Sequence, residues 1–225
     1  MQKRFLEIIA TSLDDVVRIN DSEASRIELC ADMVADGLSP SRDLITQVTQ
    51  ISRLPVRIMI RPTGRDFVYT SAEYEEMRQL IAFVKTTRAD GVVLGILETN
   101  GEIDLQRTSE LVALASPLSV TFHRAIERVR DQPSAFRQLQ SLGVQSVLSS
   151  GNAKPFEEKM PLLNELNALG FPQLIVGGGI TEEYIPLLAQ AGISRIHLGR
   201  AVRENNSYDC PVLLSRINSF VGKGL

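Results

Sequence analysis

Short runs of aliphatic and β-branched residues alternate along the whole chain with longer runs whose apolar residues recur at helical spacing. Strands are predicted near residues 5–9, 25–30, 56–61, 91–97, 118–123, 145–150, 173–178 and 194–199. Helices are predicted near residues 12–20, 41–51, 71–86, 104–115, 131–141, 156–169, 181–190 and 211–221. Strict alternation of strand and helix favours a parallel sheet.

Eight strand-helix units within 225 residues favour closure of that sheet into a barrel. We therefore predict an α/β fold, a single-domain (β/α)8 TIM barrel with a closed parallel eight-stranded sheet, over residues 1–225. An open, doubly wound sheet is the alternative. It is disfavoured because no G-x-G-x-x-G follows the first strand, and the run Gly177-Gly178-Gly179 follows the seventh.

The two-residue period of a strand assigns side chains to the two faces of the sheet. If the aliphatic residues face the helices, five polar side chains face the barrel interior. They are Glu7, Glu28, Arg61, His123 and His197. Both histidines of the chain belong to this set, and most of its members lie near strand ends, where barrel enzymes place their chemistry.

Charged groups inside a barrel must be paired, solvated or used, because burying them alone is costly. Three interpretations remain open. One is an internal ion-pair network of Arg61 with Glu7 or Glu28. Another is acid-base chemistry, with His123 as the proton-exchanging group and a carboxylate that orients it. The third is a metal held by His123, His197 and a glutamate.

The glycine run after the seventh strand predicts an anion site. Backbone N–H groups of Gly177, Gly178 and Gly179 can approach a ligand closely, and the following helix would point its positive end at an anion. Gly199 and Arg200 follow the eighth strand, the other usual contributor to phosphate sites of barrels. A tight turn that merely requires glycine is the alternative.

Four arginines, Arg61, Arg65, Arg124 and Arg200, fall just beyond predicted strand ends. Together they would make the mouth of the barrel positive, although arginines at the surface commonly form salt bridges instead.

Composition limits the partners. A net charge of −3 without a run of lysine or arginine argues against nucleic-acid binding. No stretch is long and apolar enough for a membrane span, and no signal peptide is recognisable, so we expect a cytoplasmic protein without a membrane partner. Cys30 and Cys210 lie far apart without C-x-x-C spacing, which indicates neither a disulfide framework nor a structural zinc site.

Several segments resemble the CutC family, named for copper homeostasis. They are Arg26-Ile-Glu-Leu-Cys30, Asp36-Gly-Leu-Ser-Pro40, Ile60-Arg-Pro-Thr-Gly-Arg-Asp-Phe67, Tyr69-Thr-Ser71, Val120-Thr-Phe-His-Arg-Ala125, Val147-Leu-Ser-Ser-Gly151 and Gly177-Gly-Gly-Ile180. The resemblance covers almost the whole chain. It implies a cytoplasmic TIM barrel that forms a homo-oligomer (dimer or tetramer) and a link to copper.

Copper ligation in the resembling family is attributed to cysteines at the ends of the first two strands. Here the second of these positions holds Cys30 and the first holds Ile9. One thiolate makes a poor copper(I) site, and Met33 and Met59 are expected to serve mainly in packing.

Two functions are therefore expected as alternatives. In the first, the mouth binds a small anionic or phosphorylated metabolite, with isomerase-type or lyase-type acid-base chemistry. Arg61 and Arg200 would hold the anion, the glycines and Arg124 would line its site, His123 would exchange protons, and Glu7, Glu28 and His197 would complete the catalytic set. In the second, a non-catalytic protein binds or transfers copper through Cys30, with copper as the only expected cofactor.

Overall fold

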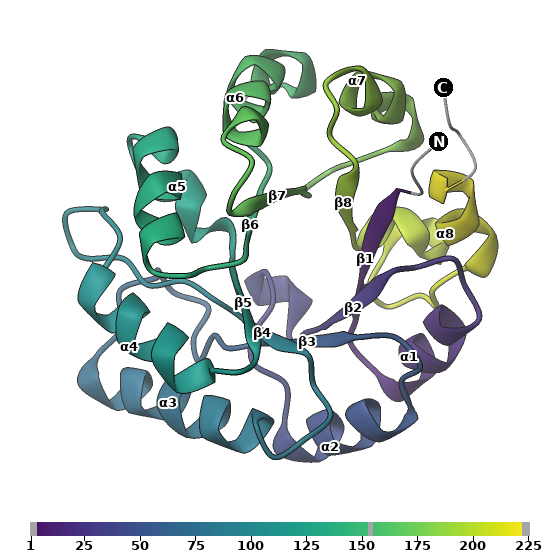
Figure 1. The fold of residues 1–225 in the computed structure, drawn as a ribbon. Coiled ribbons are helices and arrows are strands. Elements are labelled where there is room, and N and C mark those ends of the chain that lie inside the picture. Colours follow the sequence, from purple (N-terminus) through teal and green to yellow (C-terminus); the bar gives the residue numbers. More distant parts are fainter. Residues whose placement is uncertain (1–3, 153–154, 222–225) are drawn as a thin grey trace.

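The computed structural model describes residues 4–152 and 155–221. Eight parallel strands close into a barrel in which each strand pairs with the next and β8 pairs with β1 (Figure 1). The strands are β1 (Phe5–Ala10), β2 (Arg26–Leu29), β3 (Val56–Met59), β4 (Gly91–Leu94), β5 (Ser119–Phe122), β6 (Ser146–Ser149), β7 (Gln173–Val176) and β8 (Arg195–Leu198). The predicted (β/α)8 barrel is confirmed.

The helices form the outer ring (Figure 1). They are α1 (Leu13–Asn20), α2 (Arg42–Ile51), α3 (Ser71–Val84), α4 (Leu105–Ala115), α5 (Gln132–Ser141), α6 (Phe156–Ala168), α7 (Ile185–Gln190) and α8 (Leu214–Val221). Several begin at side chains that accept a backbone N–H, as Thr70 does for α3 in a reciprocal capping box with Glu73. No helix within the described residues is long and apolar enough to cross a membrane.

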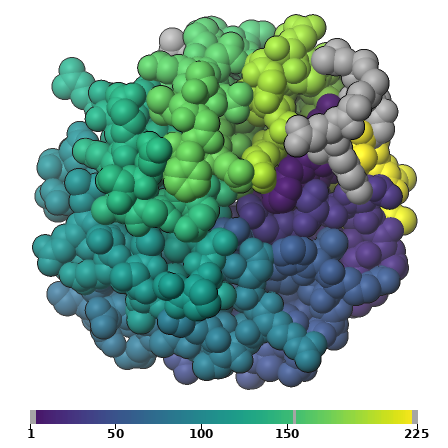
Figure 2. Space-filling model, viewed as in Figure 1, coloured from purple at the N-terminus to yellow at the C-terminus, as the bar shows by residue number. Residues whose placement is uncertain are grey.

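Closure brings the first and last strands of the chain together. The first strand and the last pair in parallel, with Glu7 opposite His197. In the space-filling view the purple N-terminal residues accordingly lie beside the yellow C-terminal segment (Figure 2). The pairing of β1 with β8 places residues separated by 190 positions next to each other inside the barrel.

The outward faces of the strands and the inner faces of the helices form one apolar core. Leu6, Ile8, Ile27, Leu29 and Ile58 are fully buried there, as the alternation pattern predicts. The interior of the barrel is different, because arginine side chains rather than aliphatic ones fill it near the N-terminal ends of the strands. A Cβ on Gly91 would lie 2.7 Å from Arg57 Cδ and 2.4 Å from the Ser119 carbonyl oxygen, so glycine is required beside this side chain.

The ends of several strands and the starts of two helices differ from the predicted ones. Most strands end one to three residues earlier than expected, so Arg61 and His123 lie in the loops just beyond β3 and β5. The helix predicted from 181 begins at Ile185, after a 3-10 helix (η3, Glu182–Tyr184). The helix predicted from 211 begins at Leu214. Val212, just before it, forms an isolated antiparallel bridge with Arg203 and is therefore extended rather than helical.

Candidate functional site

An open cavity of about 1290 Å³ lies at the carboxyl ends of the strands. Glu28, Cys30, Met59 and His197 line it from the barrel interior, and the loops after the strands form its walls. The predicted mouth of the barrel therefore exists, and most of the predicted site residues reach it.

Glu7 anchors the polar interior of the barrel beneath this cavity. Its side chain is completely buried and accepts hydrogen bonds from Arg26 Nε at 2.5 Å and from His197 Nδ1 at 2.9 Å. Burial alone would raise the pKa of Glu7, but Arg26 and His197 together lower it to about 2. Glu7 is thus a permanent carboxylate, and because it can only accept hydrogen bonds it fixes the proton of His197 on Nδ1.

The ion pair of Arg61 with Glu7 or Glu28, one of the three interpretations left open by the sequence, is not formed, because Arg26 is the ion-pair partner of Glu7. Arg26 and Glu7 are aligned in the register of β2 and β1. Arg61 instead donates from Nη1 to the carbonyl oxygens of Ala35 and Gly37, at 2.6 and 3.1 Å. It therefore fastens the loop after β2 to the wall of the cavity.

Glu28 faces the other side of His197. Its Oε2 lies 3.8 Å from His197 Nε2, which is too long for a hydrogen bond, and its buried Oε1 has no partner among the described residues. Burial raises the pKa of Glu28. Burial alone would lower the pKa of His197, but Glu28 and Glu7 raise it. A carboxyl group and an imidazole that both hold protons more tightly than usual therefore face each other at the cavity.

The Cys30 thiol is 1% exposed and donates a hydrogen bond to Glu28 Oε2 at 3.2 Å. Burial and the neighbouring Glu28 carboxyl raise its pKa well above the ordinary value. Cys30 is consequently a thiol rather than a thiolate. It packs with Ile9, Met59 and Val93, as an apolar residue would.

His123 lies on the opposite wall and is a neutral imidazole. Its Nδ1 accepts the backbone N–H of Ala125 at 3.2 Å, which leaves the proton on Nε2. Burial lowers its pKa to about 3, with a further contribution from the positive charge of Arg61. Sequence reasoning missed Gly95, which makes this position possible, since a Cβ there would lie 2.5 Å from the imidazole ring.

The loops after β7 and β8 form a third wall. Gly178, Gly179, Gly199 and Arg200 line the cavity from these loops, and Arg124, which follows β5, lines it next to Gly178. Gly178 and Gly179 have φ values of +84° and +80°, which L side chains rarely adopt.

Gly177, also predicted to cradle an anion, is not part of this lining. It is buried, and a Cβ there would lie 3.0 Å from the Cβ of His197. Gly177 therefore gives His197 its space rather than binding a ligand.

The expectation of a positive mouth is wrong for the cavity as a whole. All four predicted arginines line it, but Arg65 pairs with Glu73, and Arg124 forms two hydrogen bonds with Glu127 at 2.8 and 2.9 Å. The lining also contains seven acidic residues, Glu28, Asp32, Asp36, Asp66, Glu98, Glu127 and Asp209, against five arginines. Positive charge is therefore local, and Arg200 has no ion pair in the described part of the chain.

A long segment after β8 covers one edge of the mouth and was not predicted. Arg203 is 1% exposed and pairs with Asp15 through Nη1–Oδ1 and Nη2–Oδ2 distances of 3.0 and 2.6 Å. Tyr208 lies against Gly199, and its ring centre is 5.2 Å from Arg203 Cζ. The ion pair thereby connects the first helix to the segment that carries Tyr208 into the cavity lining.

One group of side chains has the spacing of metal ligands. Glu7, Glu28 and His197 offer ligand atoms within 4.8 Å of one another. Both oxygens of Glu7 already bind Arg26 and His197, and the nearby guanidinium group would repel a cation. His123, expected as a ligand beside His197 in one interpretation, is not in this group.

Comparisons with known proteins identify the family of the chain. Residues 4–202 match the model of the CutC family. A copper homeostasis protein cutC homolog of Mus musculus is 38% identical over 195 residues, which cover 85% of this chain and 72% of the relative. A family protein CutC of Klebsiella pneumoniae (strain 342) is 37% identical over 193 residues, covering 85% and 78%.

Solved structures show the same similarity. A CutC structure from Streptococcus agalactiae superposes with a TM-score of 0.82 at 30% identity, covering 87% of this chain and 98% of that chain. Phosphoribosyl anthranilate isomerase from Thermococcus kodakaraensis, at 14% identity and a TM-score of 0.64, shares the fold alone. The family match over most of the chain and the identity to curated relatives lead to one conclusion: this chain belongs to the CutC family.

Proposed function

We propose that the mouth of the barrel binds a small metabolite with an anionic group and exchanges a proton with it. The observation that carries this proposal is the Glu28 carboxyl group. It is 1% exposed, lines the cavity, keeps Oε1 without a partner in the described residues, and faces His197. A buried polar atom without a partner is costly in a structure that does not use it.

His197 and Glu28 are the proton-exchanging pair in this proposal. Glu7 holds His197 in one tautomer and Arg26 holds Glu7, an arrangement that fixes the direction in which Nε2 points. This assignment replaces His123 as the general base, since an imidazole whose pKa is about 3 is a weak base near neutral pH. His123 instead offers a neutral N–H donor that can polarise a carbonyl group, as neutral histidines do in other barrel enzymes.

The anionic group of the metabolite is assigned to the third wall. Backbone N–H groups of Gly178 and Gly179 and the exposed guanidinium group of Arg200 can surround it there. Arg61, held by backbone carbonyls, is assigned to the other end of the metabolite. Removal of a proton next to a carbonyl group, as in isomerases and lyases, fits this arrangement, because the proton-exchanging pair His197 and Glu28 lies opposite the neutral N–H donor of His123.

The pair can be tested by NMR, because the chain contains only two histidines. His123 is expected to remain neutral from pH 8 to 5, whereas His197 titrates above its ordinary pKa. Replacement of Glu28 by Gln should lower the pKa of His197, since a neighbouring negative charge is lost. Glycerol 3-phosphate, as a probe of the anion wall, should shift the His197 signals, and Gly178→Val should abolish that shift.

The control is Gly170→Val, which places the same residue at a φ of +74° in the open space after α6. It should retain the response to glycerol 3-phosphate. An unchanged His197 pKa in Glu28→Gln would contradict the proton-exchanging pair. An unchanged probe response in Gly178→Val would contradict the anion wall.

Copper handling is the second candidate function. Relatives carry copper homeostasis in their names, and sulfur atoms of Cys30 and Met33 both lie 3.6 Å from a Cβ built on Gly37. The residues nevertheless fit a dedicated copper(I) site poorly. Cys30 is a protonated thiol that is hydrogen-bonded to Glu28, and the first of the two family cysteine positions holds the buried Ile9.

We therefore expect copper(I) binding to be weak and easily lost to a competing chelator such as bathocuproine disulfonate. Cys30→Ser should reduce this weak binding further, and Cys210→Ser should leave it unchanged. A tight one-to-one complex that requires Cys30 and is indifferent to His123→Gln would make copper handling the leading function.

A further inference from the structure

A second charged cluster lies at the opposite end of the barrel interior, where the strands begin. Arg26 and Arg195 are the first residues of β2 and β8, and Arg57 is the second residue of β3. We call these three residues the arginine cluster. Arg26 and Arg57 are each 5% exposed, whereas Arg195 is half-buried and reaches the surface.

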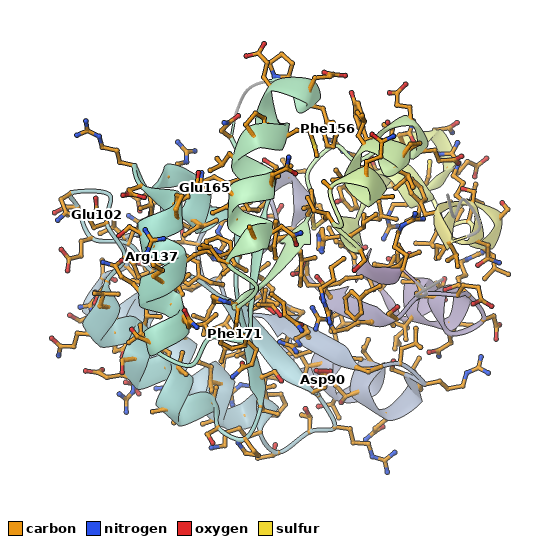
Figure 3. All side chains as sticks on the ribbon, turned by 45° about the horizontal axis from the view of Figure 1, so that its top comes forward. Asp90, Glu102, Arg137, Phe156, Glu165 and Phe171 are labelled. Atoms are coloured by element: carbon orange, nitrogen blue, oxygen red, sulfur yellow. The ribbon has the colours of Figure 1, made fainter. Side chains whose placement is uncertain are left out.

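The carboxylates around the arginine cluster do not balance its charge. Arg26 Nε pairs with Glu7, and Arg57 Nε pairs with Asp90 at 3.1 Å. Asp90, labelled in Figure 3, lies immediately before β4 at this end of the barrel. Arg195 has no ion pair among the described residues, and Arg26 Nη2 is a buried donor without a partner there. One positive charge is left unbalanced among the described residues, and the Arg26 Nη2 donor is left without a partner.

The guanidinium groups are held in place before any ligand arrives. Arg26 Cζ and Arg195 Cζ lie 4.9 and 4.6 Å from the centre of the Phe5 ring. Arg57 Nη1 donates to Thr121 Oγ1 at 3.1 Å, and Gly91 leaves room for its side chain. Such fixed donors lose little conformational entropy when they bind a ligand.

The cluster also repels itself. Burial lowers the pKa of Arg57 and of Arg195, and the positive charge of Arg26 lowers both further. An anion placed among the three groups would relieve this repulsion and could accept a hydrogen bond from Arg26 Nη2.

We propose that the arginine cluster binds a phosphate group at the N-terminal end of the barrel, remote from the mouth. Planar guanidinium forks match phosphate oxygens, and Arg195 gives the ligand access from solvent. The site is independent of the function proposed for the mouth. A cluster that served only to fill the barrel would leave phosphate affinity unchanged when Arg195 is replaced.

The test is calorimetric titration with inorganic phosphate at constant ionic strength. It uses an Arg200→Gln background, in which anion binding at the mouth is weakened. We expect one phosphate to bind, and Arg195→Gln to weaken its binding about tenfold or more, the equivalent of one lost charge-assisted hydrogen bond. Arg195→Lys keeps the positive charge but loses the planar guanidinium group, so its phosphate affinity should lie between those of the parent and of Arg195→Gln. Parallel titration with glycerol 3-phosphate tells whether the cluster takes the free ion or an ester.

The matched control is Arg88→Gln, an exposed arginine in the loop between α3 and β4 at the same end. It removes the same charge without touching the cluster and should leave the affinity nearly unchanged. Equal effects of Arg195→Gln and Arg88→Gln, or absence of phosphate binding to the Arg200→Gln protein, would overturn the proposal. If the mouth binds nothing but Arg195→Gln still weakens phosphate binding, this site stands and the function proposed for the mouth fails.

Discussion

Acidification from pH 6.5 to 4.5 is expected to lower the free energy of unfolding through His123. Burial depresses the pKa of this imidazole to about 3 in the folded protein, whereas the unfolded chain takes up its proton near 6.5. Between these values the unfolded state binds more protons, so stability falls with a slope that approaches about 1.4 kcal/mol per pH unit, a loss of roughly 2 kcal/mol over the window. Chemical denaturation across a pH series measures this slope.

Other groups also contribute to the pH dependence, so the decisive quantity is a difference. The raised pKa of Glu28 makes acidification stabilising at that group, which opposes the effect of His123. The raised pKa of His197 contributes stability that is already complete below pH 6.5 and so adds little to the slope. Glu7, with a pKa of about 2, loses its contribution only below 4.5. His123→Asn keeps an acceptor for the Ala125 N–H but cannot titrate, so its slope should be flatter than that of the parent. Parallel slopes would contradict a buried neutral His123.

The Asp15→Ala change is expected to destabilise the protein by about 3–5 kcal/mol, the usual cost of leaving one member of a buried ion pair without its partner. It removes both contacts with Arg203 and the hydrogen bonds from the Thr11 N–H and hydroxyl groups at 2.8 and 3.0 Å. Arg203 would then remain buried with two carbonyl oxygens, those of Ile9 and Cys210, as its hydrogen-bond partners and no counter-charge. Urea denaturation measures the loss.

The neighbouring Asp14→Ala supplies the control, because Asp14 is exposed and lies one position earlier in α1. It should change stability by no more than about 0.5 kcal/mol. The double variant Asp15→Ala with Arg203→Met should lose less than the sum of the two single changes, since no charge is then left buried alone. Strict additivity would show that the pair does not act as a unit.

The alternation of residue types was sufficient to predict the barrel and the direction of its interior side chains. Ile8 and Ile58 face the helices. Their neighbours Glu7 and Met59 must therefore face the barrel interior, because successive side chains of a strand point to opposite faces. A parallel sheet that alternates with helices then closes in a predictable way.

The partners within the interior could not be predicted in the same way. Which side chain meets Glu7 depends on the stagger between strands, and the register places Arg26 beside it rather than Arg61. Arg26 lies two residues before Glu28, so the same alternation already indicated that it faces inward. The role of the segment after β8 depends on a long-range contact between Arg203 and Asp15 for which the local pattern gives no signal.

Gly95 has a consequence for how this sequence can change by mutation. The missing side chain leaves the space in which the His123 ring sits, and a single methyl group would overlap that ring at 2.5 Å. Substitutions at positions 95 and 123 are therefore not independent of each other. A descendant that acquires even alanine at 95 must displace or replace its imidazole, whereas one that first loses the imidazole is free to fill the gap, so the order of the two changes is constrained in one direction.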